Sequence, residues 1–255
     1  MPEYSAGVPM WIDFSSPDLD KSRAFYEGLL GWESQVGPPE AGGYTIFQLN
    51  GKMVAGGGPT VGPDQHPAWS QYVKTADASA TAQKVKDAGG EVVMGPMDVM
   101  DQGTMAVLRD PTGAHISIWQ PRVHQGAELV NEPGTFSWSE LYTRDVPTAV
   151  EFYKKVFGWD VDETDMPGLG KYQLFKVDDR AMAGGMDMSS MLPAEIPPHW
   201  LIYFTVANTD DAIAKVKELG GEVLDGPNPT PMGPMALIRD PVGAAFAVIQ
   251  INQQS

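Results

Sequence analysis

The 255-residue sequence contains two copies of one unit, and this repetition constrains the fold more than any other feature. The segment 11–32 recurs as 138–159. Both begin with Trp, carry Phe-Tyr in the middle and end in Gly-Trp. The segment 84–92, Lys-Val-Lys-Asp-Ala-Gly-Gly-Glu-Val, recurs as Lys-Val-Lys-Glu-Leu-Gly-Gly-Glu-Val at 215–223. Similar segments in the same order at a nearly constant offset indicate a tandem duplication.

The duplication divides the chain into two domains of ordinary size. The stretch from Pro121 to Gly134, which contains both proline and glycine, separates the two copies. We therefore expect a first domain at 1–122, a linker at 123–134 and a second domain at 135–255.

Each copy divides once more into two similar halves. In the first half, a strand at Met10–Ser15 precedes a helix that Asp18 caps and Gly31 ends, because apolar residues follow with helical spacing. Alternating strands follow at 43–49 and 52–56. The pattern restarts with a strand at Trp69–Thr75, a helix capped by Asp77, and strands near 91–94, 104–109 and 114–119. The sequence thus predicts four βαβββ units and an α+β fold.

Two such units side by side form a curved sheet with helices on one face. The other face is then a concave cup lined by alternate residues of each strand. A cup of this kind is a natural ligand site.

Three motifs in both copies carry a family resemblance. They are the Phe-Tyr helix that ends in Gly-Trp, the Gly-Gly-Glu-Val segment, and the Asp-Pro-x-Gly hairpin before the last strand. On these motifs the chain resembles the glyoxalase / bleomycin-resistance / extradiol-dioxygenase superfamily, the vicinal oxygen chelate proteins. The two-domain arrangement is similar to glyoxalase-like proteins of actinobacteria. The resemblance implies a tandem duplication of a vicinal-oxygen-chelate domain, with four βαβββ units forming two cupped mixed sheets.

The resemblance also implies one divalent metal in a cup, held by His, Glu or Gln on the first and fourth strands of each unit. Carrying these positions over residue by residue finds no such ligand in either copy. We therefore expect no metal and no cofactor. The positions fall on Trp11, Gly56, Ser70 and Ser117 in the first copy and on Trp138, Gly184, Leu201 and Ala247 in the second.

Both copies instead carry an acid two residues after the first tryptophan. Alternation places Asp13 and Ser15 on the face of Trp11, and Glu140 and Tyr142 on the face of Trp138. A tryptophan beside a carboxylate could stack on a flat ligand and pair with its hydroxyl or cationic group. Asp13 and Glu140 could also act as catalytic acids or bases if burial raised the pKa of their carboxyl groups. The alternative is that the tryptophans only fill the core.

Further candidate ligand-binding residues lie on the fifth strand, the last strand and the rim. Core packing or plain solvation is the competing reading for all of them. The last strand is more polar in the first copy than in the second, which favours the first cup as the ligand site. These candidates are Tyr72, Tyr203, His115, Ser117, Trp119 and His199.

The composition excludes several classes of function. The formal net charge is −16, and residues 1–125 alone carry 8 basic and 14 acidic side chains, so nucleic-acid binding is not expected. Without a long apolar run we expect no membrane span. Without cysteine there is no thiolate nucleophile or disulfide. We expect a cytoplasmic protein that is a monomer or a homodimer and takes a small-molecule ligand.

Three functions stay open at this point. The first is a metal-independent binding protein for a small organic molecule, aromatic or cationic and antibiotic-like. The second is a metal-independent enzyme, a lyase, isomerase or hydroxylase-like protein, that uses Asp13 or Glu140 as acid or base. The third is a non-catalytic regulatory or interaction protein.

Overall fold

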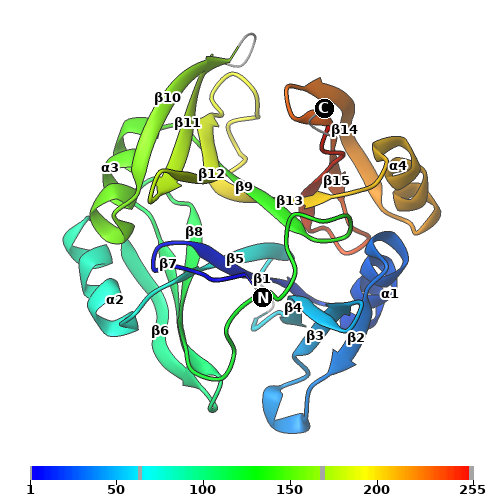
Figure 1. Ribbon diagram of the computed structural model, residues 1–255, viewed down its shortest axis with the longest axis horizontal. Helices are drawn as coiled ribbons and strands as arrows, with labels where there is room; N and C mark the ends of the chain where they lie inside the picture. Colours follow the sequence, from blue (N-terminus) through cyan, green and yellow to red (C-terminus); the bar gives the residue numbers. More distant parts are fainter. Residues whose placement is uncertain (1, 63–64, 167–169, 253–255) are drawn as a thin grey trace.

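The computed structural model describes residues 2–62, 65–166 and 170–252. The first copy forms one eight-stranded mixed sheet in the order β2-β3-β4-β1-β5-β8-β7-β6. Its two βαβββ units meet where β1 pairs antiparallel with β5 (Figure 1). The elements are β1 (Pro9–Ser16), α1 (Leu19–Leu30), β2 (Glu33–Val36), the 3-10 turn η1 (Pro39–Ala41), β3 (Thr45–Leu49), β4 (Lys52–Pro59), β5 (Ala68–Lys74), α2 (Ala78–Asp87), β6 (Glu91–Val99), β7 (Gly103–Arg109) and β8 (His115–Pro121).

The second copy repeats this sheet with the order β10-β11-β12-β9-β13-β16-β15-β14. The predicted α+β class and the predicted four βαβββ units in two mixed sheets are therefore confirmed. The elements of this copy are β9 (Phe136–Thr143), α3 (Val146–Phe157), β10 (Asp160–Met166), β11 (Gly170–Val177), β12 (Arg180–Asp187), β13 (His199–Thr205), α4 (Thr209–Glu218), β14 (Glu222–Thr230), β15 (Gly233–Arg239) and β16 (Ala245–Ile249).

The helices begin and end at the residues that the sequence singled out. The Asp18 carboxylate accepts a hydrogen bond from the Lys21 amide at 3.0 Å and caps α1. Gly31 ends α1 with a φ of +72°, a left-handed conformation that glycine adopts without strain. Asp77 caps α2 in the same way as Asp18 caps α1, through the Ala80 amide at 2.9 Å.

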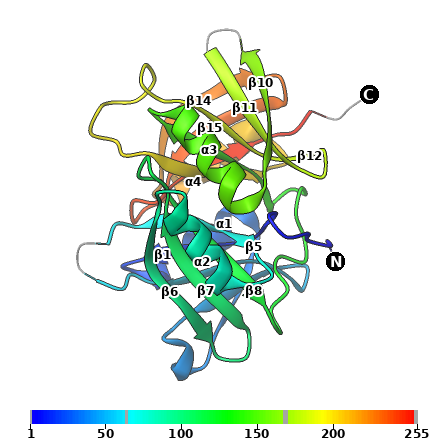
Figure 2. The same cartoon turned by 90° about the vertical axis from the view of Figure 1, so that its left-hand side faces the viewer.

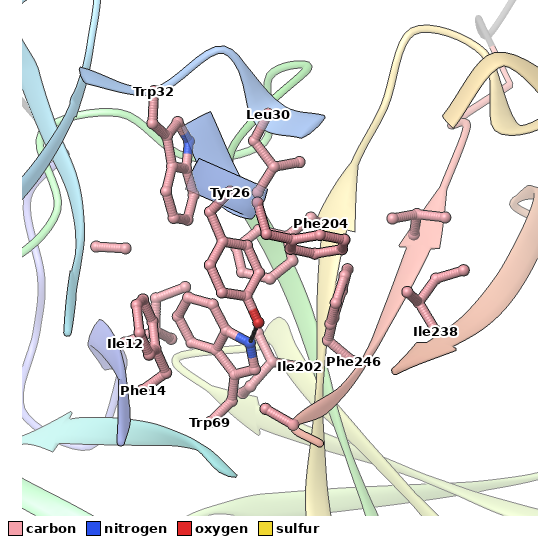
Figure 3. Packing of buried hydrophobic residues seen from close by; sticks show 14 of the residues in the cluster. Ile12, Phe14, Tyr26, Leu30, Trp32, Trp69, Ile202, Phe204, Ile238 and Phe246 are labelled. Atoms are coloured by element: carbon pink, nitrogen blue, oxygen red, sulfur yellow. Dashed lines mark hydrogen bonds between the residues drawn. The ribbon is translucent and has the colours of Figure 1, made fainter. Parts of the chain in front are cut away.

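The helix-covered faces of the two sheets pack against each other. Helix α1 contacts α4 and α2 contacts α3, on opposite sides of the molecule (Figures 1 and 2). One apolar core combines the first unit of the chain with the last, so that Phe14, Tyr26 and Trp69 lie in the same cluster as Phe204 and Phe246 (Figure 3). A second core combines the two middle units. The domains therefore share both cores, and the opposite face of each sheet is left to form a cup.

A buried hydrogen bond joins the domains inside the first core. The Tyr26 hydroxyl of α1 donates to Asp240 Oδ2 of the second domain at 2.9 Å. Trp69 Nε1 donates to the same hydroxyl at 2.9 Å, and Figure 3 shows these two side chains together. Asp240 Oδ1 accepts backbone amides of its own hairpin. The phenol thus supplies the hydrogen bond that the second carboxylate oxygen needs in a buried position.

The second core contains the reciprocal bond. The Tyr153 hydroxyl of α3 donates to Asp110 Oδ2 at 2.8 Å, and Trp200 Nε1 donates to Tyr153 at 2.9 Å. The Phe-Tyr motif and the Asp-Pro-x-Gly motif, which marked the repeat in the sequence, are the two ends of these inter-domain bonds.

No helix among the described residues is long and apolar enough to cross a bilayer.

Candidate functional site

The first cup is the face of the first sheet opposite its helices. Trp11 and Asp13 of β1 both lie on this face, as the alternation along the strand predicted. Partly buried apolar side chains of several strands pack around them. The cluster holds Met10, Trp11, Tyr72, Trp119 and Ala127, with Tyr4, Ile46, Met53, Val99, Met105 and Val130 packed against it.

A short chain of hydrogen bonds links Trp11 to Asp13. Trp11 Nε1 donates to the Tyr44 hydroxyl at 3.0 Å, and that hydroxyl donates to Asp13 Oδ2 at 3.1 Å. Tyr72 of β5 donates to the same oxygen at 2.9 Å. The carboxyl group of Asp13 is therefore held by two phenols, one from each unit of the sheet.

The second cup contains the same chain on its own β9. Trp138 Nε1 donates to the Tyr172 hydroxyl at 3.0 Å, and Tyr172 donates to Glu140 Oε1 at 2.7 Å. Glu140 Oε2 accepts hydrogen bonds from Tyr203 at 2.5 Å and from Tyr142 at 3.2 Å. Glutamate is one methylene longer than aspartate, and it reaches three phenols where Asp13 reaches two.

Tyr44 and Tyr172 were missed by the sequence reasoning. Tyr44 lies two residues before Ile46, which pairs with Gly56. Tyr172 lies two residues before Leu174, which pairs with Gly184. A Cβ on Gly56 would lie 2.0 Å from the Tyr44 hydroxyl oxygen, and a Cβ on Gly184 would lie 1.8 Å from that of Tyr172. Only glycine leaves room for these hydroxyls. A tyrosine paired with a glycine at matching positions of both copies was the signal that could have found them.

The strand register does not place the four positions of the expected metal site in one row. Asp13 pairs with both Gly56 of β4 and Ser70 of β5. Trp11 lies two residues earlier and pairs with Tyr72, which in turn pairs with Ser117 of β8. Trp11 and Asp13 share one face of β1, because a shift of two residues keeps a side chain on its face.

The second copy repeats this register. Glu140 pairs with Gly184 and with Leu201, whereas Trp138 pairs with Tyr203, which in turn pairs with Ala247. In each cup one carboxylate therefore lies opposite a glycine of the neighbouring strand.

Burial sets the electrostatics of both acids. It raises the pKa of the Asp13 carboxyl group to about 6, and the hydrogen bonds from Tyr72 and Tyr44 limit the rise because they stabilise the charged form. Burial also raises the pKa of Glu140 against the hydrogen bonds of its three phenols. Both residues are only partly buried as a whole. A carboxyl group with a raised pKa can act as an acid or a base.

The two cups differ in how their tryptophans are covered. Trp11 is 4 % exposed, and the His124 ring from the inter-domain segment packs edge-on against it with centroids 4.3 Å apart. Trp138 is partly exposed. His124 was given no role from the sequence, because its place in the linker did not indicate which surface the linker follows.

The other predicted residues divide between the cup and its rim. Ser117 is buried and pairs with Tyr72, while Trp119 is buried and donates through Nε1 to the His124 carbonyl at 3.0 Å. His115 is exposed at the start of β8, opposite Arg109, and outside the apolar cluster.

Two further candidates lie beside the cups' centres. Ser15 is partly exposed near the end of β1, where it pairs with Gly58 and Ala68. His199 stacks on Tyr142 with centroids 5.4 Å apart and an interplanar angle of 8°, and burial lowers the pKa of its imidazole. The second cup therefore has an aromatic rim that the first cup lacks.

The donors in the cups do not fit the divalent metal that the family resemblance implies. In the first cup Asp13 is a single carboxylate, Gly56 supplies no donor, and the Tyr44 hydroxyl fills the space beside that glycine. Divalent metals in such sites need several carboxylate, imidazole or thiolate ligands together. In residues 2–62, 65–166 and 170–252, no three His, Asp, Glu or Cys side chains come close enough to share an ion.

A surface depression of about 460 Å³ lies away from both cups. It is lined by Gly89–Glu91 and Arg109–Gly113 and contains none of the tryptophan–carboxylate residues. Its Arg109 and Glu91 side chains already pair with each other, and it offers no convergent set of free polar groups. The cups are therefore the stronger candidate sites.

Comparison with known proteins agrees with this architecture. The model of the Glyoxalase/Bleomycin resistance protein/Dioxygenase superfamily matches residues 10–118 and again 130–248. The 2,3-dioxygenase LapB from Pseudomonas sp. KL28 has the same fold, with a TM-score of 0.66 at 14% identity over 96% of this chain and 93% of that chain.

Two curated relatives are much closer in sequence. The anthracycline biosynthesis protein DauV of Streptomyces sp. strain C5 is 38% identical over 270 residues, which cover 99% of this chain and 96% of that protein. The Mycobacterium tuberculosis protein named "Putative glyoxylase CFP32" is 36% identical over 257 residues, which cover 97% and 96%. The chain therefore belongs to the glyoxalase / bleomycin-resistance / dioxygenase superfamily, as a tandem two-domain member.

Proposed function

We propose that this protein binds a small, flat, hydroxylated aromatic molecule without the help of a metal ion, and that the second cup is the site. The observation that supports the proposal is that Trp138 and Glu140, both only partly buried as residues, lie on one face of β9 and are joined through the Tyr172 hydroxyl. An aromatic face and a carboxylate at this spacing can hold the ring and one polar group of the same ligand.

The chemistry of the second cup suits such a ligand. Trp138 offers an aromatic surface, and Glu140 offers a carboxylate that accepts a hydroxyl or pairs with a cationic group. The surrounding wall is apolar and includes methionines, whose flexible side chains adapt to ligands of different shape. This wall consists of Met186, Met188, Leu192, Leu201, Met235, Leu237, Ala247 and Ile249.

The net charge and the relatives support the same class of ligand. A charge of −16 attracts cationic groups such as an amine on an aromatic molecule. DauV and the related DnrV of Streptomyces peucetius are named anthracycline biosynthesis proteins, and anthracyclines are flat hydroxylated aromatic compounds. We extend to this chain only the ligand class, a hydroxylated aromatic ring system.

The test is titration with alizarin, a flat hydroxylated anthraquinone, followed by quenching of tryptophan fluorescence and by calorimetry. Glu140→Gln should weaken binding about tenfold or more, because a hydrogen bond to a charged acceptor contributes roughly 1.5–3 kcal/mol. Asp13→Asn is the matched control, since it makes the equivalent change in the cup whose tryptophan is covered. Equal affinity of Glu140→Gln and the unaltered protein would reject the second cup as the site.

A second candidate function rests on the raised pKa of both acids. A carboxyl group with a pKa of about 6, such as Asp13, can take up and release protons near neutral pH, and the tyrosines around it can relay them. A lyase, isomerase or hydroxylase-like reaction on a polyketide-like or aldehyde substrate would use Asp13 or Glu140 in this role. Turnover that is lost in Glu140→Gln while binding is retained would favour this enzyme over a pure binding protein.

A further inference from the structure

The segment that joins the domains follows the first cup instead of extending away from it. We call residues 122–128 the strap. It contacts the turn between β6 and β7 on one side and β1 and β4 on the other, so it bridges both units of the sheet. Four of its backbone N–H groups donate to this sheet: Arg122 and His124 to the Gln102 carbonyl at 3.0 and 3.1 Å, Ala127 to Met10 at 2.8 Å and Glu128 to Met53 at 2.7 Å.

The strap inserts an aromatic ring between the two tryptophans of the first cup. The His124 ring lies 4.3 Å from the Trp11 ring at an interplanar angle of 82°, and 5.5 Å from the Trp119 ring at 74°. The His124 carbonyl accepts the hydrogen bond from Trp119 Nε1. Because its backbone is bonded on both sides, the imidazole is held in a slot with two indole walls.

The His124 ring lacks a hydrogen bond that a buried polar side chain usually makes. Nε2 is buried and has no hydrogen-bond partner within the described part of the chain. Burial lowers the pKa of the imidazole to about 4, so the ring is neutral at neutral pH. A buried polar atom without a partner is uncommon in folded proteins and calls for an explanation. The neutral imidazole ring is thus held between the two indoles by ring contacts.

The second cup has no ring in this position. Trp138 makes no ring–ring contact of this kind among residues 2–62, 65–166 and 170–252, and it is partly exposed. The second copy has Ile249 where the first has Trp119. The first cup thus has a ring of the protein against its tryptophan, whereas no ring in the described part of the chain makes this contact with Trp138.

We propose that the first cup is a second, latent binding site for a flat aromatic nitrogen heterocycle, and that the His124 imidazole of the strap occupies it in this structure. The proposal rests on the proposed function in one respect, namely that an aromatic ring against the cup tryptophan is how this fold holds a ligand. It follows that the unaltered chain takes one ligand, in the second cup, and that removal of the His124 ring opens the first.

The first experiment refills the slot with imidazole itself. Imidazole is added to the full-length His124→Gly protein at about pH 8, where it is mostly neutral. The thermal unfolding midpoint should rise by about 3–5 °C at ten times the dissociation constant of imidazole, and further with the logarithm of the imidazole concentration. His124→Ala is a second variant with the same expectation. Gln125→Gly in the strap is the control and should respond no more than the unaltered protein. The same response in all four proteins would overturn the proposal.

The second experiment measures alizarin and imidazole binding separately by calorimetry. Alizarin, the probe of the second cup, should bind once per chain to the unaltered protein, to His124→Phe and to His124→Gly, whereas imidazole should bind only to His124→Gly. No imidazole binding to His124→Gly overturns the latent site, whatever alizarin does. A clear imidazole response without any alizarin binding leaves the latent site standing and rejects the proposed function of the second cup. The two proposals therefore fail on different results.

Discussion

Replacing Asp13 with asparagine removes a carboxyl group whose charged form is destabilised by burial. The pKa of Asp13 is about 6 in the folded protein against its ordinary value of 3.8, a difference of about 2 pH units. Each unit corresponds to about 1.36 kcal/mol, so the folded state carries a penalty of about 3 kcal/mol once Asp13 is ionised. Since Asp13 is only partly buried as a residue, this penalty is an upper limit.

The direction of the pH dependence follows from proton binding at Asp13. Between pH 3.8 and about 6 the folded protein binds more protons at Asp13 than the unfolded chain does. The contribution of Asp13 to stability is therefore fully present below the unfolded pKa and is lost as the pH rises through the folded pKa. Asparagine does not titrate. The free energy of unfolding of Asp13→Asn, relative to the unaltered protein, should rise by at most about 2.4 kcal/mol between about pH 4 and about pH 8, because the unfolded Asp13 is already partly ionised at pH 4.

The measurement is urea unfolding at a series of pH values, followed by tryptophan fluorescence. The Asn amide oxygen can still accept from Tyr44 and Tyr72, so any fixed cost of the substitution cancels when only the pH dependence is compared. Glu195→Gln, at an exposed position, is the control and should show no such trend. A flat difference for Asp13→Asn, with the Asp13 carboxyl carbon titrating near 4 by NMR, would refute the reasoning.

Two other predictions test the packing, and a third tests whether the cups hold a metal ion. Gly56→Ala should destabilise the protein by about 2 kcal/mol or more in urea unfolding, because the new Cβ displaces the Tyr44 hydroxyl and breaks its two hydrogen bonds. Gly58→Ala should cost less, because its Cβ would lie 3.3 Å from the Tyr44 ring. Tyr26→Phe should lower the free energy of unfolding by about 1–3 kcal/mol in the same assay, because it leaves Asp240 Oδ2 buried without its inter-domain donor. An unchanged stability would argue against a shared core. Protein dialysed against Zn²⁺ or Mn²⁺ should retain no stoichiometric metal by elemental analysis, and one tightly held ion per chain would contradict the reading of the cups.

The architecture could be predicted because it depends on patterns that are local and repeated. Strand alternation, the Asp18 cap and the Gly31 stop each depend on neighbours within one helical turn or one strand. The duplication then doubled the information, since the same pattern occurred twice. The four units and the acids on the faces of Trp11 and Trp138 were therefore accessible from the sequence.

The details of the cups were less accessible. The register that places Asp13, rather than Trp11, opposite Gly56 depends on pairing between strands that are distant in sequence. Tyr44 was missed because its hydroxyl reaches Asp13 only through the space that Gly56 leaves. His124 was missed because nothing local indicates that the strap follows the first cup.

By itself, the sequence determined the duplication, the α+β units and the acid beside each first-strand tryptophan, because hydrophobic period, capping and turn chemistry act over a few residues. Only the tertiary structure decided that the Phe-Tyr helix of one domain bonds to the Asp-Pro-x-Gly hairpin of the other. It also decided that the two cups differ, with Trp11 covered by His124 and Trp138 partly exposed. These contacts join residues 43 to 214 positions apart, or loops whose path no local pattern sets, and packing of the whole chain selects them.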